Sequence, residues 1–188
     1  MLTGPLRWES RMSRPQARDD APFLSGLKDL EKLFNEGHYD QVIELADQLL
    51  AKFGVFACFL SLKALAQSNA GIGDQEAYLT LQEALRAPDA DIGDWYVAGE
   101  YALELGRFDE AADYFSQAIN LSQQQGDDYY LSCCYVLRPY ALVQLGKTEL
   151  ARTDLDKVGD DEDSTITWLY KIGPISKQSV LKSIKKLH

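Results

Sequence analysis

The stretch that decides the fold runs from Asp94 to Leu121 and reads DWYVAGEYALELGRFDEAADYFSQAINL. Apolar residues recur at helical spacing in its two halves, and Gly106 separates the halves. Asp109 and Glu110 follow the glycine closely, where acidic side chains suit the N-terminal dipole of a helix. The stretch therefore predicts two amphipathic α-helices joined by a tight turn.

Three other parts of the chain repeat this arrangement more loosely. Breaks rich in glycine or polar residues divide residues 23–158 into four expected helix pairs, at 23–54, 55–88, 91–125 and 127–158. Either Asp91 or Asp94 begins the third pair. Pro139 falls inside the first helix of the fourth pair, which predicts either a kink there or a later start of that helix.

The four pairs share a register in their second helices. Small residues in the first half of these helices are separated by 35, 34 and 40 positions, and larger residues follow at the spacing of one helical turn. A glycine precedes each second helix, although Gly71 and Gly73 straddle that place in the second pair. The aligned sets are Val42, Ala77, Ala111 and Ala151; Ala46, Leu81, Phe115 and Leu155; Leu49, Ala84, Ala118 and Val158; and Gly37, Gly106 and Gly146.

This register resembles the tetratricopeptide repeat (TPR) family, whose unit of about 34 residues has the pattern W-x2-L-G-x2-Y, then A-x3-F, then P. In the third pair Trp95, Gly99, Ala111, Phe115 and Ala118 stand at family positions, whereas Ala98, Ala102 and Gln123 replace its Leu, Tyr and Pro. The resemblance covers about residues 24–158. It implies an all-α fold, a right-handed α-solenoid of about four TPR-like helix pairs, in which the first helices line a concave surface.

The two ends of the chain lie outside the repeats. Residues 1–22 are polar, rich in arginine and proline, and expected to be disordered, and Met12 is an alternative native start to Met1. Residues 159–188 begin with an acidic loop and end in a helix that Ser176 caps. Its apolar residues, Val180, Leu181, Ile184 and Leu187, are expected to cap the last repeat. Alternatively, this basic tail folds against an acidic part of the body or against a partner.

Charge is distributed unevenly along the 188 residues, whose formal net charge is −10. Residues 1–24 carry +1 and residues 165–188 carry +5, so that residues 25–164 carry −16. An acidic body repels phosphates and argues against nucleic-acid binding. It favours a basic protein partner, although solubility alone also accounts for such a charge.

The sequence suggests no membrane, cofactor or enzyme chemistry. No apolar run is long enough to span a bilayer and no signal peptide is evident, so we expect a cytoplasmic protein. Three cysteines, Cys58, Cys133 and Cys134, without a C-x-x-C pair argue against a zinc or redox site, and no cofactor or metal is expected. Paired carboxylates such as Glu100 and Glu104 are the only candidates for acid–base catalysis, and runs of acids are usually solvated. We therefore expect no enzyme.

The TPR resemblance implies a partner-binding surface on the first helices, acidic and aromatic in character. Tyrosine there would offer large amphipathic contacts. The alternatives are that Glu100 and Glu104 form a solvated face and that Tyr96 belongs to the core. The candidate partner-binding residues are Glu31, Tyr96, Glu100, Leu103, Glu104, Tyr140 and Gln144.

These features predict a non-catalytic protein-interaction module, present as a monomer or a homodimer. In its small size and acidity the chain is similar to bacterial immunity proteins, which neutralise a toxin by binding it. The alternatives are an adaptor or assembly chaperone, and a structural repeat protein that associates with itself.

Overall fold

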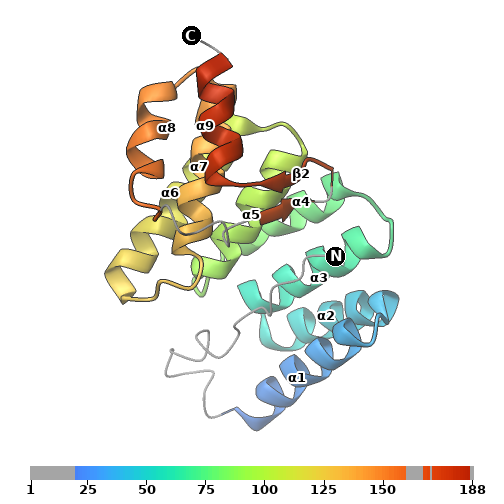
Figure 1. Ribbon diagram of the computed structural model, residues 1–188. Coiled ribbons are helices and arrows are strands. Elements are labelled where there is room, and N and C mark those ends of the chain that lie inside the picture. Colours follow the sequence, from blue (N-terminus) through green and yellow to red (C-terminus); the bar gives the residue numbers. More distant parts are fainter. Residues whose placement is uncertain (1–19, 160–166, 170, 187–188) are drawn as a thin grey trace. The chain divides into compact units, whose positions relative to one another are not determined.

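The computed structural model describes residues 20–159, 167–169 and 171–186 (Figure 1). Internal contacts divide these residues into two compact units, 20–94 and 95–186. The division was not predicted from the sequence, which suggested one repeat domain over 23–158. It falls in the first turn of a helix, between Asp94 and Trp95.

The described residues form nine α-helices and one short β-ribbon, in which β1 pairs with β2 antiparallel. Eight helices make four consecutive pairs, so the predicted all-α, TPR-like helical-repeat fold is confirmed. The elements are α1 (Ala21–Asn35), α2 (Tyr39–Phe53), α3 (Ala57–Asn69), α4 (Asp74–Ala84), α5 (Ile92–Glu104), α6 (Phe108–Gln125), α7 (Leu131–Gln144), α8 (Thr148–Leu155), β1 (Thr167–Leu169), β2 (Gly173–Ile175) and α9 (Lys177–Lys186).

The same turn joins the helices of every pair. In the second pair Ile72 N–H donates to the carbonyl of Gln67 at 3.0 Å and Gly71 N–H donates to that of Ser68 at 3.1 Å, a Schellman motif with a left-handed glycine. This identifies Gly71, not Gly73, as the repeat glycine. The equivalent residues, with φ between 70° and 79°, are Gly37, Gly71, Gly106 and Gly146.

The register of the second helices holds in space. The four small residues Val42, Ala77, Ala111 and Ala151 are each fully buried. The four residues one turn later are also buried, namely Ala46, Leu81, Phe115 and Leu155. In the last three pairs a small residue is therefore followed one turn later by a large one, whereas Ala46 stands at the second position in the first pair.

A close approach in the third pair joins Gly99 of α5 and Phe115 of α6. A Cβ atom on Gly99 would lie 2.6 Å from Cε1 of Phe115, well inside van der Waals contact. At the corresponding places in the first pair stand Leu30 and Ala46, both fully buried. In the first pair the large residue is thus on the first helix and the small one on the second, the reverse of the third pair. Either arrangement fills the space between the two helices.

Replacing Gly99 with Ala should lower the free energy of unfolding by about 1–3 kcal/mol, because the methyl group overlaps the Phe115 ring. Urea denaturation followed by circular dichroism measures the loss. In a Phe115→Leu background the same substitution should cost clearly less, since the smaller side chain makes room. Equal costs in the two backgrounds would show that Phe115 does not impose the glycine.

Carboxylates fix the start of α3 and of α5. Asp89 accepts the Ala57 N–H with both carboxylate oxygens, at 2.9 and 3.0 Å. Asp91 caps α5, since its side chain accepts from Asp94 N at 3.3 Å, and Asp94 in turn accepts from Asp91 N at 2.9 Å. Asp94 is buried and also receives the Ser61 hydroxyl at 2.6 Å. Of the two candidates for the first residue of the third pair, Asp91 is therefore the cap.

Pro139 is tolerated within α7, which begins eight residues before it and continues to Gln144. The alternative of a later helix start is therefore wrong. The proline leaves one carbonyl of the preceding turn without its helical N–H donor. It occupies the place that Gly99 has in the third pair, and its side chain is buried.

The predicted ends of the chain need two corrections. Helix α1 begins at Ala21, within the segment 1–22 expected to be disordered, because Asp20 accepts the Phe23 N–H at 3.4 Å and Pro22 suits the first turn. The ribbon of β1 and β2 was not predicted from the sequence. Ser176 caps α9 as predicted, receiving Ser179 N at 3.2 Å. Residues 1–19 and most of the acidic loop lie outside the described residues.

Candidate functional site

The seven predicted partner-binding residues fall in both units. Glu31 lies on α1 in the first unit and is half-buried. The other six come from α5 and α7 of the second unit: Tyr96, Glu100, Leu103, Glu104, Tyr140 and Gln144. The structure therefore brings six of the seven onto two neighbouring first helices.

Three of these six belong to the core. Tyr96 is 8% exposed, Glu100 4% and Leu103 1%, so the expectation that they line an open surface is corrected. The Tyr96 hydroxyl donates to Oε1 of Glu100 at 2.7 Å, one helical turn away on the same face. The alternative that Tyr96 is a core residue is the one observed.

Glu100 is a buried carboxyl group whose pKa is raised to about 8. Burial is the main cause and the nearby Glu104 adds to it, whereas the hydrogen bond from Tyr96 acts in the opposite direction. The pKa of Tyr96 is also raised, first by burial and then by Glu100. At neutral pH Glu100 is thus mostly protonated and contributes little negative charge to any surface.

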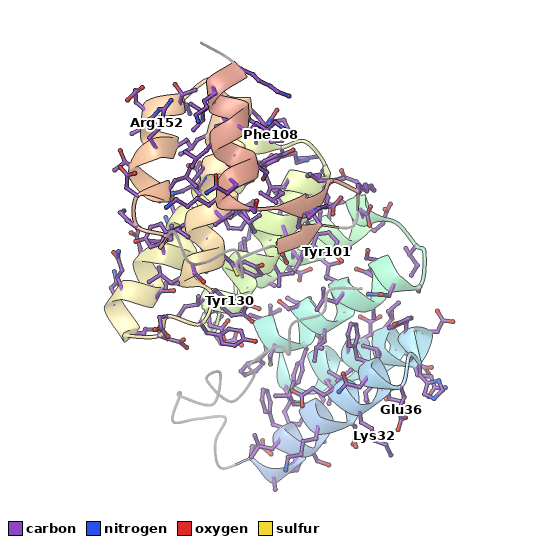
Figure 2. The ribbon with its side chains drawn as sticks, in the orientation of Figure 1. Lys32, Glu36, Tyr101, Phe108, Tyr130 and Arg152 are labelled. Atoms are coloured by element: carbon purple, nitrogen blue, oxygen red, sulfur yellow. The ribbon has the colours of Figure 1, made fainter. Side chains whose placement is uncertain are left out.

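Two further tyrosines extend this pair toward the surface. Tyr130, labelled in Figure 2, stacks on Tyr96 with ring centroids 4.6 Å apart. Tyr129 meets Tyr130 edge-on, with ring centroids 4.7 Å apart. Both are half-buried and lie in the turn before α7, next to the exposed Asp128. Neither was predicted as a site residue, although two adjacent aromatic residues in a polar loop are a usable signal.

Glu104, Tyr140 and Gln144 are the accessible members of the predicted set, and the chain itself engages Glu104. Its two carboxylate oxygens accept the backbone N–H of Lys171, at 2.8 and 3.0 Å. Tyr140 is half-buried, and burial and Glu104 together raise its pKa. Gln144 is exposed.

An ionic network that was not predicted from the sequence joins the last three helices of the repeats. Arg138 of α7 donates to both carboxylate oxygens of Asp154 on α8, at 2.6 and 2.7 Å, and to the hydroxyl of Ser116 on α6, at 3.0 Å. The side chains of Arg138 and Asp154 are 18% and 5% exposed. No spacing rule places residues from three helices together, so only the tertiary structure reveals this network.

Of the two neighbouring cysteines of α7, Cys134 is the more buried. Cys134 is fully buried, and burial, then Cys133, raises the pKa of its thiol, so the thiol stays protonated at neutral pH. None of the three cysteines forms a disulfide.

Neither a metal site nor a membrane span occurs in the part of the chain that the structure describes. In it, no group of three or more His, Cys, Asp or Glu side chains is placed to hold a metal ion. No helix within these ranges combines the length and apolar character needed to cross a bilayer.

Comparison with known proteins gives a likeness of structure alone. No protein-family model matches the chain, and no curated protein matches it. The chain is similar to a chain in the structure of Naa15/Naa10 bound to HypK-THB, with 18% sequence identity and a TM-score of 0.47. The similarity covers 71% of this chain and 24% of the other, so this chain spans about a quarter of the length of the one it matches.

Proposed function

We propose that the chain is a non-catalytic protein-interaction module whose acidic surface binds a basic protein or peptide. The observation that carries this proposal is the charge of the two helical units. Residues 20–94 contain 13 acidic and 5 basic residues, and residues 95–159 contain 10 and 5. Such an excess attracts a basic partner and speeds its approach.

The exposed acids gather on second helices. Asp40, Glu44 and Asp47 follow one another at helical spacing along α2, and all three are exposed. Asp109 and Asp113 do the same on α6. Tyr96 and Glu100 are buried, so the accessible acids lie instead on these two stripes, one in each unit. Within them Asp47 and Asp109 are paired with Lys63 and Lys147, at 2.6 and 3.4 Å.

The chemistry of the buried polar groups supports a non-catalytic role. Glu100 is held neutral and bonded to Tyr96, and Asp154 is held by Arg138 inside the helix packing. Each group stabilises contacts between or along helices. A helical-repeat scaffold with a charged surface is well suited to binding another protein.

Selection from a random-peptide display library tests the proposal directly. The purified chain should enrich peptides of net positive charge, and raising the salt concentration from about 0.05 M to about 0.5 M should weaken their binding steeply. Enrichment of neutral or acidic peptides, or binding insensitive to salt, would contradict the proposal.

Neutralising the α2 stripe should weaken the binding of a selected basic peptide. The variant Asp40→Asn with Glu44→Gln should raise the Kd several-fold at low salt and hardly at all at high salt, because screening already removes the long-range attraction. Isothermal titration calorimetry at both salt concentrations measures this. Gln41→Ala, an exposed neutral change on the same helix, is the control and should leave the Kd unchanged.

Three more specific functions fit this proposal, and they differ in the partner that the chain would bind. An immunity protein would bind a basic toxin, and inhibition of a basic nuclease by the purified chain tests that function. An adaptor or assembly chaperone would bind a component of a larger assembly. A self-associating protein would form a stable dimer, which light scattering detects. In each version we place the chain in the cytoplasm, where its three thiols would stay reduced.

A further inference from the structure

The C-terminal segment, residues 167–186, packs on the same helices that the sequence assigned to a partner. Strand β2 contacts α7, and α9 contacts α7 and α8, as the red elements of Figure 1 show. The turn of the ribbon reaches α5, where Glu104 receives the Lys171 N–H. The chain thus places its own segment against α5 and α7.

The ribbon buries one of its faces. Leu169 pairs with Gly173, and Ile175 follows Gly173 by two residues on β2, so Leu169 and Ile175 lie on the same side of the two strands. Leu169 and Ile175 are each 2% exposed, whereas Pro174, on the opposite side, is exposed. Two aliphatic side chains therefore anchor the ribbon on either side of the turn that contains Lys171.

The contact with Glu104 uses the backbone of Lys171. A carboxylate that accepts an amide N–H recognises the main chain and sets no requirement for a particular side chain. Any extended segment with two aliphatic anchors around a turn could present the same groups to α5 and α7.

The charges of the two sides are complementary. The ribbon, residues 167–175, carries one lysine, Lys171, and no acidic residue, whereas the repeats of the second unit, residues 95–159, have twice as many acids as bases. The other four lysines of the C-terminal segment lie on α9. The occupant of this face is therefore net positive, as the proposed partner is.

We propose that the β1–β2 ribbon is a built-in, exchangeable occupant of the α5/α7 face, and that this face accepts a basic partner segment with two aliphatic anchors in its place. This proposal rests on the proposed function, and it specifies the kind of segment that a basic partner would insert at the α5/α7 face. Helix α9 stays in place as the cap of the last repeat, since its Val180 and Ile184 are 1% and 0% exposed.

A labelled synthetic peptide of residues 167–176 tests this exchange on the full-length chain. The wild-type chain should bind the peptide weakly, because its own ribbon competes. Replacing Ile175 with Asp removes one anchor of the ribbon and leaves α5 and α7 intact, so fluorescence anisotropy should show a Kd lower by about tenfold or more. Adding Glu104→Ala to Ile175→Asp removes the acceptor and should cancel most of that gain.

Lys182→Asp is the matched control, since it adds the same side chain at an exposed position of α9 and should leave peptide binding at the wild-type level. An Ile175→Asp chain that melts cooperatively but gains no affinity for the peptide would overturn the proposal. The display selection tests the proposed function with peptides unrelated to the ribbon. Failure of the ribbon-exchange experiment therefore leaves the result of that selection unaffected.

Hydrogen exchange of the wild-type chain decides the matter if Ile175→Asp fails to fold. Amides of the ribbon that are protected in the folded state should exchange about tenfold or more faster than the central amides of α7, through openings that release the ribbon alone. Exchange of both sets at one common rate would mean that the ribbon leaves only on global unfolding, and the proposal would be wrong.

Discussion

Replacing Glu100 with Gln is expected to stabilise the chain at neutral and alkaline pH and to flatten its pH–stability profile. Glutamine has the same shape, can still accept the hydrogen bond from Tyr96, and carries no proton that folding must retain. The effect should be below about 1 kcal/mol at pH 5 and reach about 4 kcal/mol at pH 8.

The direction follows from the raised pKa of Glu100. In the folded chain this pKa is about 8, whereas a glutamic acid in an unfolded chain titrates near its model value of 4.5. Between these values the folded state binds a proton that the unfolded state has released. The contribution of Glu100 to stability is therefore fully present below about pH 4.5 and is lost as the pH rises through 8.

Urea denaturation of both proteins at several pH values from 5 to 8 measures the difference. Subtracting the two profiles removes the titration of the other groups, so only Glu100 and its close neighbours contribute. Asp113→Asn, at an exposed carboxyl group of α6, is the control and should track the wild type. A Glu100→Gln profile parallel to that of the wild type would show that Glu100 is already ionised in the folded chain.

The fold was predictable because its determinants are local. The spacing of Ala111, Phe115 and Ala118 sets the face of one helix, and the same spacing recurs in each second helix. The turn glycines are equally local, since a Schellman turn involves six consecutive residues. Only in the second pair did the sequence leave two candidates, and the hydrogen bonds of Gly71 decide between them.

The candidate site was less predictable because burial depends on distant parts of the chain. Glu100 and Tyr96 lie on a first helix, as an open TPR groove would require, but both are buried. One local signal was available: from Trp95 to Leu103 Glu100 is the only charged residue, and a helix apolar on all sides is usually buried.

The ribbon escaped prediction for a different reason. Each strand has three residues, too few to show an alternating pattern. What holds the ribbon is long-range, namely the contact between Lys171 and Glu104, 67 positions apart.

Replacing Asp154 with Ala is expected to lower the free energy of unfolding by about 3–5 kcal/mol, a large loss for a single polar side chain. The substitution leaves the Arg138 guanidinium among α6, α7 and α8 without its two carboxylate contacts, and of these three hydrogen bonds only the one to the Ser116 hydroxyl remains. A buried cation without a counter-charge is far more costly than the loss of an exposed ion pair.

The exposed ion pair between Lys147 and Asp109 provides the matched comparison. It also joins two helical pairs, with its atoms 3.4 Å apart, but its side chains are 50% and 75% exposed. Lys147→Ala should therefore cost no more than about 1 kcal/mol. Urea denaturation of Asp154→Ala and Lys147→Ala measures both losses of stability. A much larger loss for Asp154→Ala would show that burial of the ion pair, and not ion pairing alone, causes the effect.

A double variant, Arg138→Met with Asp154→Leu, shows what the network contributes beyond filling space. Both charges are removed together, and apolar side chains of similar size can pack between the helices. Lys157, whose Nζ lies 3.5 Å from Oδ1 of Asp154, loses this contact but remains in reach of water, since its side chain is 45% exposed. Most of the stability lost in Asp154→Ala should return. If the double variant is as unstable as the single one, the network contributes through geometry that apolar packing cannot replace, and the cost of the unpaired guanidinium is not the main term.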